Sequence, residues 1–209
     1  MRIAVILFAY KRPRYLKRCL ASLENVVGLD YYAFVDHSPM QDKIAGIIKK
    51  MGFFNIIKRE NNYGLSKNIV QGISKIFQLG YEAVIVIEDD IVLEPDALTY
   101  SINSLIKYKD NKKIGQISLQ GDFPTCTGWA MWKDRWDRID FDNVPLEGWL
   151  AKPYKKHKTW GIITRHNLDM LGLEARGKKL AKHIGTIGEH SNILSKFGIR
   201  KLFREWKYG

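Results

Sequence analysis

Three consecutive carboxylates, Glu88, Asp89 and Asp90, directly follow an apolar run at residues 83–87. Clustered carboxylates repel one another and carry a large desolvation cost unless a cation lies among them. Hard divalent ions such as Mg²⁺ and Mn²⁺ prefer carboxylate oxygens, and at nucleotide sites they bind only a few of them, leaving positions for phosphate and water. The pattern therefore predicts a metal that bridges these acids to a diphosphate.

The spacing of the three acids gives an expectation about their directions. In an extended chain, residues two positions apart point the same way, so Glu88 and Asp90 are expected to converge while Asp89 diverges. The alternative is an acidic turn that caps the next helix, with Glu94 or Asp96 near its N-terminus. That alternative explains Glu94 and Asp96, but it does not explain three acids directly after an apolar strand.

The first 120 residues alternate short apolar runs with longer helical patterns. Such alternation is typical of βαβ units, and it predicts an α/β fold with a mostly parallel sheet covered by helices on both faces. Ligands of such sheets bind at the carboxyl ends of the strands, where the acids lie. Strands are expected at residues 2–9, 31–36, 53–60, 82–90 and 113–121, and helices at 13–26, 40–52, 64–80 and 94–109.

The pattern changes after Gly121. Residues 127–140 are rich in aromatics, and Trp129, Trp132 and Trp136 form one stripe at helical spacing, so a helix with a core-facing side is expected there. Residues 179–191 predict a strand leading into a loop, and the C-terminal residues form a basic amphipathic segment. We expect a single domain in which residues 1–120 form an α/β scaffold of a size that suits a nucleotide and residues 121–209 line and close one side of it.

Composition excludes several classes of protein. The chain is 45% hydrophobic and 27% charged, as in ordinary globular proteins, and its apolar runs fall short of the roughly 20 residues that a membrane helix needs. Its two cysteines have no disulfide or zinc spacing, which predicts a reducing, cytoplasmic compartment. The net charge of +12 favours polyanionic partners such as nucleotides or phospholipid head groups, although a solvated basic surface explains it equally well.

Several segments together resemble glycosyltransferases with the GT-A fold, the nucleotide-diphospho-sugar transferase fold. The segment "EDDIVLEPDAL" is similar to the "EDDL…PD" segment of the N-acetylglucosaminyltransferase I family and of family-2-like glycosyltransferases. The resemblance covers residues 1–150 and, beyond them, only "HIGTIGEHS". The other matching segments, in the same order as in these families, are "ILFAYKRPRYLKRCLASL", "FVDHS", "RENNYGLSKNIVQGI" and "GWAMWKDRW".

The resemblance implies a set of nucleotide-binding residues. Arg12 would approach the diphosphate, because a guanidinium matches phosphate oxygens bidentately. Asp36 would bond to the base or ribose, although it is equally explained as a turn residue. The whole implied set is Ala9, Tyr10, Arg12, Asp36, Asn61, Gly64, Asn68, Glu88 and Asp89.

The resemblance also implies metal ligands for Mn²⁺ or Mg²⁺. Asp90 would be the principal ligand, with Glu88 beside it. Several enzymes of this fold place a late histidine on the metal or the diphosphate, which makes His190 the candidate in "HIGTIGEHS". The alternative for His190 is a polar loop residue.

An inverting transferase further needs a general base that removes the acceptor's hydroxyl proton. The resembling family carries this carboxylate in a "W-D-D-W" stretch, and "LEGW" lies at the corresponding distance here, so Glu147 is the candidate. Gly148 replaces one acid of that stretch and Leu146 replaces its tryptophan, which weakens the match. Asp134 and Asp137, which share one helix face at i, i+3, are rival bases, or are surface charges paired with neighbouring cations.

These observations predict a metal-dependent glycosyltransferase that moves a sugar from a UDP-sugar, or another nucleotide-sugar, to a hydroxyl of a glycan or glycolipid, with inversion. The basic C-terminal segment would add a peripheral membrane contact. One alternative is a nucleotidyl- or phosphoryl-transferase with the same metal–diphosphate site. Another is a basic module without enzymatic activity that binds nucleic acid or a membrane, although no nucleic acid partner is expected.

Overall fold

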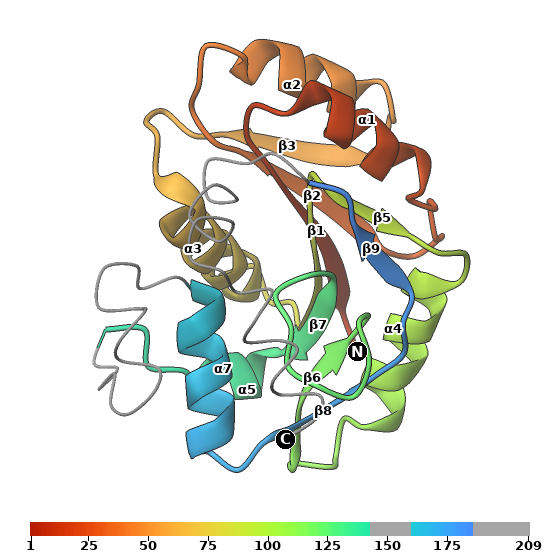
Figure 1. Ribbon diagram of the computed structural model, residues 1–209, viewed down its shortest axis with the longest axis vertical. Coiled ribbons are helices and arrows are strands. Elements are labelled where there is room, and N and C mark those ends of the chain that lie inside the picture. The colour runs from red at the N-terminus through yellow and green to blue at the C-terminus, as the bar shows by residue number, and fades with distance from the viewer. Residues whose placement is uncertain (143–159, 186–209) are drawn as a thin grey trace, which may run out of the picture.

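The protein is an α/β domain built on one twisted central sheet. A computed structural model describes residues 1–142 and 160–185 (Figure 1). Within these residues the sheet has seven strands in the order β3-β2-β1-β4-β7-β6-β8. The predicted fold class is confirmed: the sheet is mostly parallel and helices cover both of its faces.

Four parallel strands form the half of the sheet that carries the acids. Every residue of β1 is buried, as expected for a strand covered on both faces. Its side chains alternate between two cores, with Val5 and Leu7 in one and Ile6 and Phe8 in the other. These strands are β1 (Ile3–Ala9), β2 (Asp30–Val35), β3 (Phe54–Lys58) and β4 (Ala83–Glu88), each within two residues of its predicted bounds.

The helices divide between the two faces of the sheet. One face packs against the helices before and after β2 and against the helix after β4, and the opposite face packs against the two remaining long helices (Figure 1). The first group is α1 (Pro13–Ala21), α2 (Gln41–Lys49) and α4 (Ala97–Lys107), and the second is α3 (Gly64–Gln78) and α7 (Trp160–Met170). Among the described residues, no helix is long and apolar enough to cross a membrane.

The helix predicted over residues 127–140 is wrong. Residues 129–132 form strand β7 (Trp129–Trp132), which pairs antiparallel with β4 and with β6 (Ile114–Ser118). Only the one-turn helix α5 (Lys133–Trp136) follows it. All four residues of β7 are buried, and a short apolar run of this kind cannot be told from a helix by periodicity alone.

The tryptophans nevertheless belong to the core, as expected. Trp129 stacks on Trp136 with ring centroids 6.3 Å apart and on Trp160 at 5.4 Å. Together with Trp132, these side chains are at most 4% exposed, so they pack in the core and are not available to a ligand. Trp149 lies outside the described residues.

Three short strands complete the fold. β8 (Glu174–Gly177) joins the edge of the central sheet beside β6, and a separate pair consists of β5 (Ile91–Leu93) and β9 (Ala181–His183). β9 lies within the predicted strand of residues 179–191, whereas β5 and β8 were not expected from the sequence. The predicted basic C-terminal segment lies outside the described residues.

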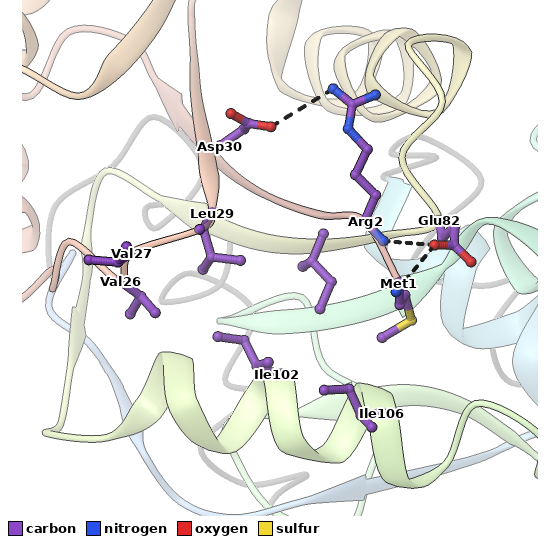
Figure 2. A pocket seen from close by; sticks show the side chains of 11 residues that line it. Met1, Arg2, Val26, Val27, Leu29, Asp30, Glu82, Ile102 and Ile106 are labelled. Atoms are coloured by element: carbon purple, nitrogen blue, oxygen red, sulfur yellow. Dashed lines mark hydrogen bonds and ion pairs between the residues drawn. The ribbon is translucent and has the colours of Figure 1, made fainter.

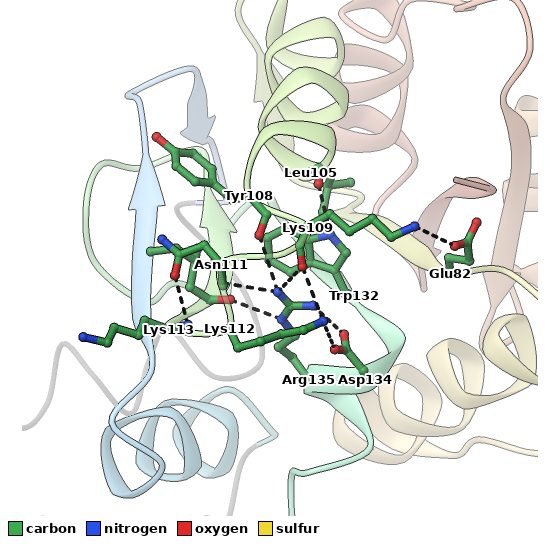
Figure 3. Close-up of polar contacts among 11 residues, drawn as sticks. Glu82, Leu105, Tyr108, Lys109, Asn111, Lys112, Lys113, Trp132, Asp134 and Arg135 are labelled. Carbon is green, nitrogen blue, oxygen red and sulfur yellow. Dashed lines mark hydrogen bonds and ion pairs between the residues drawn. The ribbon is translucent and has the colours of Figure 1, made fainter.

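A buried arginine holds α5 to the connection between α4 and β6 (Figure 3). Arg135 is 2% exposed, and its guanidinium donates to the carbonyl oxygens of Lys109 at 2.7 Å and of Asn111 and Ile114 at 3.3 Å. It also lies over the ring of Trp132. Arg135 therefore donates to carbonyl groups of the segment that follows the C-terminus of α4, including that of the buried Ile114.

Candidate functional site

The candidate site lies where the order of the parallel strands reverses. From β1 the chain proceeds to β2 and β3 on one side, while β4 pairs with β1 on the other side. Ligands of open α/β sheets bind at such a switch point, outside the carboxyl ends of the strands. Phe8 is the partner of Glu88 in the register, so the residues that follow β1 and β4 meet there.

Arg12 bridges two of the three acids. It is the residue before α1, and Pro13 at the first helical position fixes where the helix begins. Its Nη2 lies 2.5 Å from Asp89 Oδ1, and its Nη1 lies 2.5 Å from Asp90 Oδ2. The arginine expected at the diphosphate is thus at the acid cluster, where it neutralises part of the negative charge.

Asp89 is held inside the site and does not diverge from it. Its side chain is 2% exposed, and its Oδ2 accepts a hydrogen bond from the backbone N–H of Tyr10 at 3.0 Å. Burial raises the pKa of Asp89 even though Arg12 favours the carboxylate. The expected alternation of directions is wrong, because β4 ends at Glu88 and residues 89 and 90 form a turn, in which the strand period no longer applies.

Asp90 carries a carboxylate oxygen without a partner. Its Oδ2 accepts from Arg12 and lies 3.1 Å from His183 Nε2, whereas its Oδ1 is buried and has no hydrogen-bond partner among the described residues. Burial raises the pKa of Asp90, but His183 and Arg12 outweigh that effect and lower the pKa below its usual value. Asp90 is therefore ionised, and its buried Oδ1 is left without a partner by the described residues.

The negative charge of Glu88 is the least compensated of the three acids. It is half-buried, and desolvation, followed by the charges of Asp90 and Asp89, raises its pKa to about 8. Arg12 offsets only part of this effect. Near neutral pH the cluster therefore keeps a proton that an additional positive charge would displace.

One feature of these residues suits a divalent cation: the unpartnered oxygen of Asp90. A buried carboxylate oxygen without a partner is costly, and a cation is one of the groups that can satisfy it. Within residues 1–142 and 160–185 no three His, Cys, Asp or Glu side chains are arranged to hold a metal on their own. A cation here would depend on Asp90 and His183 and on oxygens from outside the described chain.

His183 was not singled out as a metal ligand from the sequence. His190, the histidine chosen there, lies outside the described residues, as does the general-base candidate Glu147. His183 reaches Asp90 because β9 pairs with β5, which places Ile91 opposite His183. The signal in the sequence was the pair of histidines that bracket "HIGTIGEHS", and it did not say which one lies near the acids.

Asp36 holds the start of α3. Its Oδ1 accepts from the backbone N–H of Tyr63 and its Oδ2 from that of Gly64, both at 2.9 Å. A carboxylate at this position is stabilised by the unpaired N–H groups of the helix N-terminus. Asp36 N donates to Ala9 O at 3.0 Å, so Ala9, Asp36 and Gly64, three of the residues predicted to bind the nucleotide, lie together at the ends of β1 and β2. Gly64 has φ of 72°, which favours glycine.

The three asparagines of this region differ in their surroundings. Asn68 is 3% exposed and its Oδ1 accepts from Arg59 Nε at 2.8 Å, so it secures α3 to the end of β3. Asn61 is exposed. Asn62, which was not predicted, donates to the hydroxyl of Tyr10 at 3.0 Å and accepts from Gly64 N at 2.9 Å.

Asp134 and Asp137 lie far from the acid cluster. The backbone N–H of Lys133 donates to Glu82 O, so α5 begins at the amino-terminal end of β4, whereas Glu88 ends that strand. Asp134 pairs with Lys112 at 2.8 Å and Asp137 pairs with Lys133. The structure thus does not bring these two rival bases to the site, and their ion pairs explain them as surface charges.

Cys126 lies in a loop near enough to the acids for their charges to act on its thiol. The loop that carries it is fixed by the buried Gln116, whose side chain donates to Thr125 O at 3.0 Å and accepts from Thr125 N at 2.8 Å. The thiol is exposed to solvent, yet burial and then the charge of Glu88 raise its pKa to about 11.

A separate groove of about 630 Å³ lies at the opposite, amino-terminal edge of the sheet (Figure 2). Val27 and Ile106 are exposed there, at 98% and 59%. The charged groups along it are paired with one another: Arg2 N donates to Glu82 at 2.7 Å, and the Arg2 side chain lies 3.9 Å from Asp30. The groove therefore has no unpartnered charged group comparable to Asp90 Oδ1.

Comparison with known proteins gives a family and a fold. The family model described as glycosyl transferase family 2 matches residues 4–123. No curated protein sequence matches the chain.

Solved structures with a similar fold include both glycosyltransferases and a nucleotidyltransferase. A mannosyltransferase from Pyrobaculum calidifontis, in complex with GDP-Man and Mn²⁺, superimposes with a TM-score of 0.61 at 12% identity over 93% of this chain and 60% of that chain. TarS from S. aureus gives 0.57 at 13% identity over 89% and 61%. A CMP-2-keto-3-deoxy-manno-octonic acid synthetase complexed with CTP gives 0.54 at 12% identity over 98% and 99%. At these identities the likeness establishes the fold, and this chain spans about 60% of the length of the first two.

Proposed function

This chain belongs to glycosyl transferase family 2, and on that premise we propose that it transfers a sugar from a nucleotide-sugar to a hydroxyl group of a glycan or glycolipid. The observation that carries the proposal is Asp90, an ionised and buried carboxylate with one oxygen unpartnered, at the switch point of the sheet. The proposed donor is a UDP-sugar and the proposed outcome is inversion. The finer resemblance to N-acetylglucosaminyltransferase I rests on the sequence segments alone.

Asp90 and His183 would hold a divalent cation, Mn²⁺ or Mg²⁺. The mannosyltransferase of similar fold binds Mn²⁺ together with GDP-Man, which supports this assignment. The cation would supply Lewis-acid stabilisation of the negative charge that builds on the departing nucleoside diphosphate. Glu88, with its raised pKa, would then lose its proton and add to the negative charge around that cation.

The chain's own residues would bind and orient the donor. Arg12 offers a planar guanidinium between the acids and the start of α1, suited to phosphate oxygens. Tyr10 and Asn62 lie between the ends of β1 and α3, where they would form part of the nucleoside pocket. Asp36 would position the N-terminus of α3 beside that pocket. Glu147 remains the proposed general base, on the sequence alone.

A nucleotidyltransferase is the second candidate, favoured by the likeness in fold to the synthetase complexed with CTP over nearly the full length of both chains. The two reactions release different products. A glycosyltransferase releases a nucleoside diphosphate from a nucleotide-sugar, whereas a nucleotidyltransferase releases pyrophosphate from a nucleoside triphosphate.

We also propose that the basic C-terminal segment of the sequence brings the enzyme to an anionic membrane.

Calorimetry with UDP, GDP and CDP, each with Mn²⁺ and with EDTA, tests the proposal. We expect UDP to bind at least about tenfold more tightly with Mn²⁺, and Asp90→Asn to abolish that gain. Asp134→Asn is the matched control, because that acid is in a surface ion pair far from the cluster. Equal affinity in EDTA, or release of pyrophosphate from CTP without turnover of any nucleotide-sugar, would overturn the proposal.

A further inference from the structure

The segment that carries His183 is fixed to the body of the protein before it reaches the acids. We call residues 179–185 the strap. At its start, the backbone N–H groups of Leu180 and Ala181 both donate to Leu119 O at 3.0 Å. Gln120 Nε2 donates to Ala181 O at 2.5 Å. The strap therefore enters the site in a register set by residues of the β6–β7 connection.

The strap then runs along β5 and ends on Asp90 itself. β9 pairs antiparallel with β5, and the two strands lie side by side in Figure 1. One residue later, the backbone N–H of Ile184 donates to Asp90 O at 2.8 Å. This last bond places His183 and Gly185, on either side of Ile184, against the Asp90 side chain.

Gly185 packs against the carboxylate of Asp90. A Cβ atom added to Gly185 would lie 2.3 Å from Asp90 Oδ2, 3.0 Å from its Cγ and 3.1 Å from His183 Cε1. Its φ is outside the left-handed region, so glycine is required here for space and not for backbone conformation. Any side chain at this position would displace either Asp90 or the strap.

Neither Asp90 nor the strap can move without breaking a contact in the site. The Oδ2 atom that the added methyl group would meet is the one held by Arg12 Nη1 at 2.5 Å and by His183 Nε2 at 3.1 Å. Turning the carboxylate away breaks both of these contacts, and Asp90 is only 3% exposed, which leaves its side chain little room to turn. Lifting the strap instead removes His183 from Asp90.

We propose that Gly185 is a positioning residue of the site. Because Gly185 has no side chain, the strap can pack directly against Asp90. This contact keeps Arg12 and His183 beside Oδ2 and leaves Oδ1 without a partner. The predicted consequence for nucleotide binding rests on the proposed function, whereas the steric relation between Gly185 and Asp90 does not.

A cycle of two substitutions tests the steric relation without any nucleotide. We expect Gly185→Ala to lower the thermal midpoint by about 5 °C, because overpacking forces a shift in a buried region. In an Asp90→Ala background the same substitution should cause almost no further shift, because the obstructing carboxylate is gone. Gly46→Ala is the control: Gly46 lies exposed in α2 with open space around it, and alanine there should leave the midpoint unchanged or raise it.

The cycle remains decisive if Gly185→Ala does not fold. Recovery of folding in the double variant then supports the proposal, whereas an equal loss in both backgrounds overturns it, because the clash would not involve Asp90.

Calorimetry with UDP and Mn²⁺ separates the role of Gly185 from the proposed function. Gly185→Ala should bind at least about tenfold more weakly than the unsubstituted protein. Equal binding by both overturns the role of Gly185, and no Mn²⁺-dependent binding by the unsubstituted protein overturns the proposed function.

Discussion

Arg12 and Asp90 are separated by 78 residues in the chain, yet Arg12 Nη1 lies 2.5 Å from Asp90 Oδ2. A second arm of the same guanidinium reaches Asp89. Only a planar, forked donor can bridge both carboxylates in this way, so lysine is not an equivalent substitute. The pair joins the ends of β1 and β4 across the switch point. Its loss should lower the free energy of unfolding and weaken nucleotide binding.

We expect Arg12→Lys to reduce the free energy of unfolding by about 1 kcal/mol and Arg12→Met by about 3 kcal/mol, because methionine leaves two buried carboxylates without their cation. Urea denaturation measures both. Arg14→Lys is the matched control: Arg14 is exposed on α1 and forms no ion pair within the described chain, so its replacement should stay within about 0.5 kcal/mol. Equal effects at positions 12 and 14 would show that the bridge does not contribute.

Cys126 should react slowly with alkylating agents although it is exposed. The thiolate is the reactive form, and a pKa of about 11 leaves very little of it at pH 8. We expect iodoacetamide to modify Cys126 at pH 8 at least about tenfold more slowly than it modifies an unstructured cysteine peptide, with the rate still rising above pH 9. Mass spectrometry of the intact protein follows the reaction.

Cys126→Ser separates this thiol from the other one. Cys19 is buried and should remain unmodified until the protein unfolds, so the serine variant should take up no label under native conditions. Modification of Cys126 at pH 8 as fast as in the free peptide would contradict the raised pKa of this thiol.

Arg135 should be among the most sensitive positions outside the site. Arg135→Met removes the donor of three backbone carbonyl groups, of which that of Ile114 belongs to a buried residue, and an unsatisfied buried group costs about 1–3 kcal/mol. We expect a loss of about 2 kcal/mol in urea denaturation. Arg138→Met, at an exposed position of the same region, should cost less than about 0.5 kcal/mol. A similarly small loss at Arg135 would mean that water replaces the guanidinium.

The sequence predicted the parallel half of the sheet well because each of its strands carries a local signal. The runs in β1 and β4 are apolar without alternation, which is typical of strands buried on both faces, and Pro13 marks the start of α1. The same reasoning placed Asp90 at the carboxyl end of β4. These predictions needed only neighbouring residues in the chain.

Predictions failed where contacts between distant segments decide the structure. Residues 129–132 carry a spacing that suits a helix, but pairing with β4 and β6 makes them a strand. His183 reaches Asp90 only through the pairing of two three-residue strands, which is too short a pattern to detect in the sequence. Asp89 turned toward Arg12 because the strand ended one residue before it, and strand ends are predicted to within two residues at best.

Glu88 should make stability depend on pH. Its pKa is about 8 in the folded protein and near the usual 4.5 when unfolded, so the folded state retains a proton that the unfolded state releases between these values. Relative to Glu88→Gln, the unsubstituted protein should therefore lose stability as the pH rises from about 5 to 8, by at least about 1 kcal/mol.

Urea denaturation of both proteins at pH 5, 6.5 and 8 in EDTA measures this difference, and Glu60→Gln, at an exposed position outside the cluster, should give a curve parallel to that of the unsubstituted protein. Mn²⁺ should reduce the difference in the free energy of unfolding between the unsubstituted protein and Glu88→Gln at pH 8, because a cation beside Asp90 favours the ionised form of Glu88. A difference that does not change with pH would mean that Glu88 is already ionised at pH 5. The three carboxylates would then be ionised together without a metal ion, and the cluster would not need a further cation.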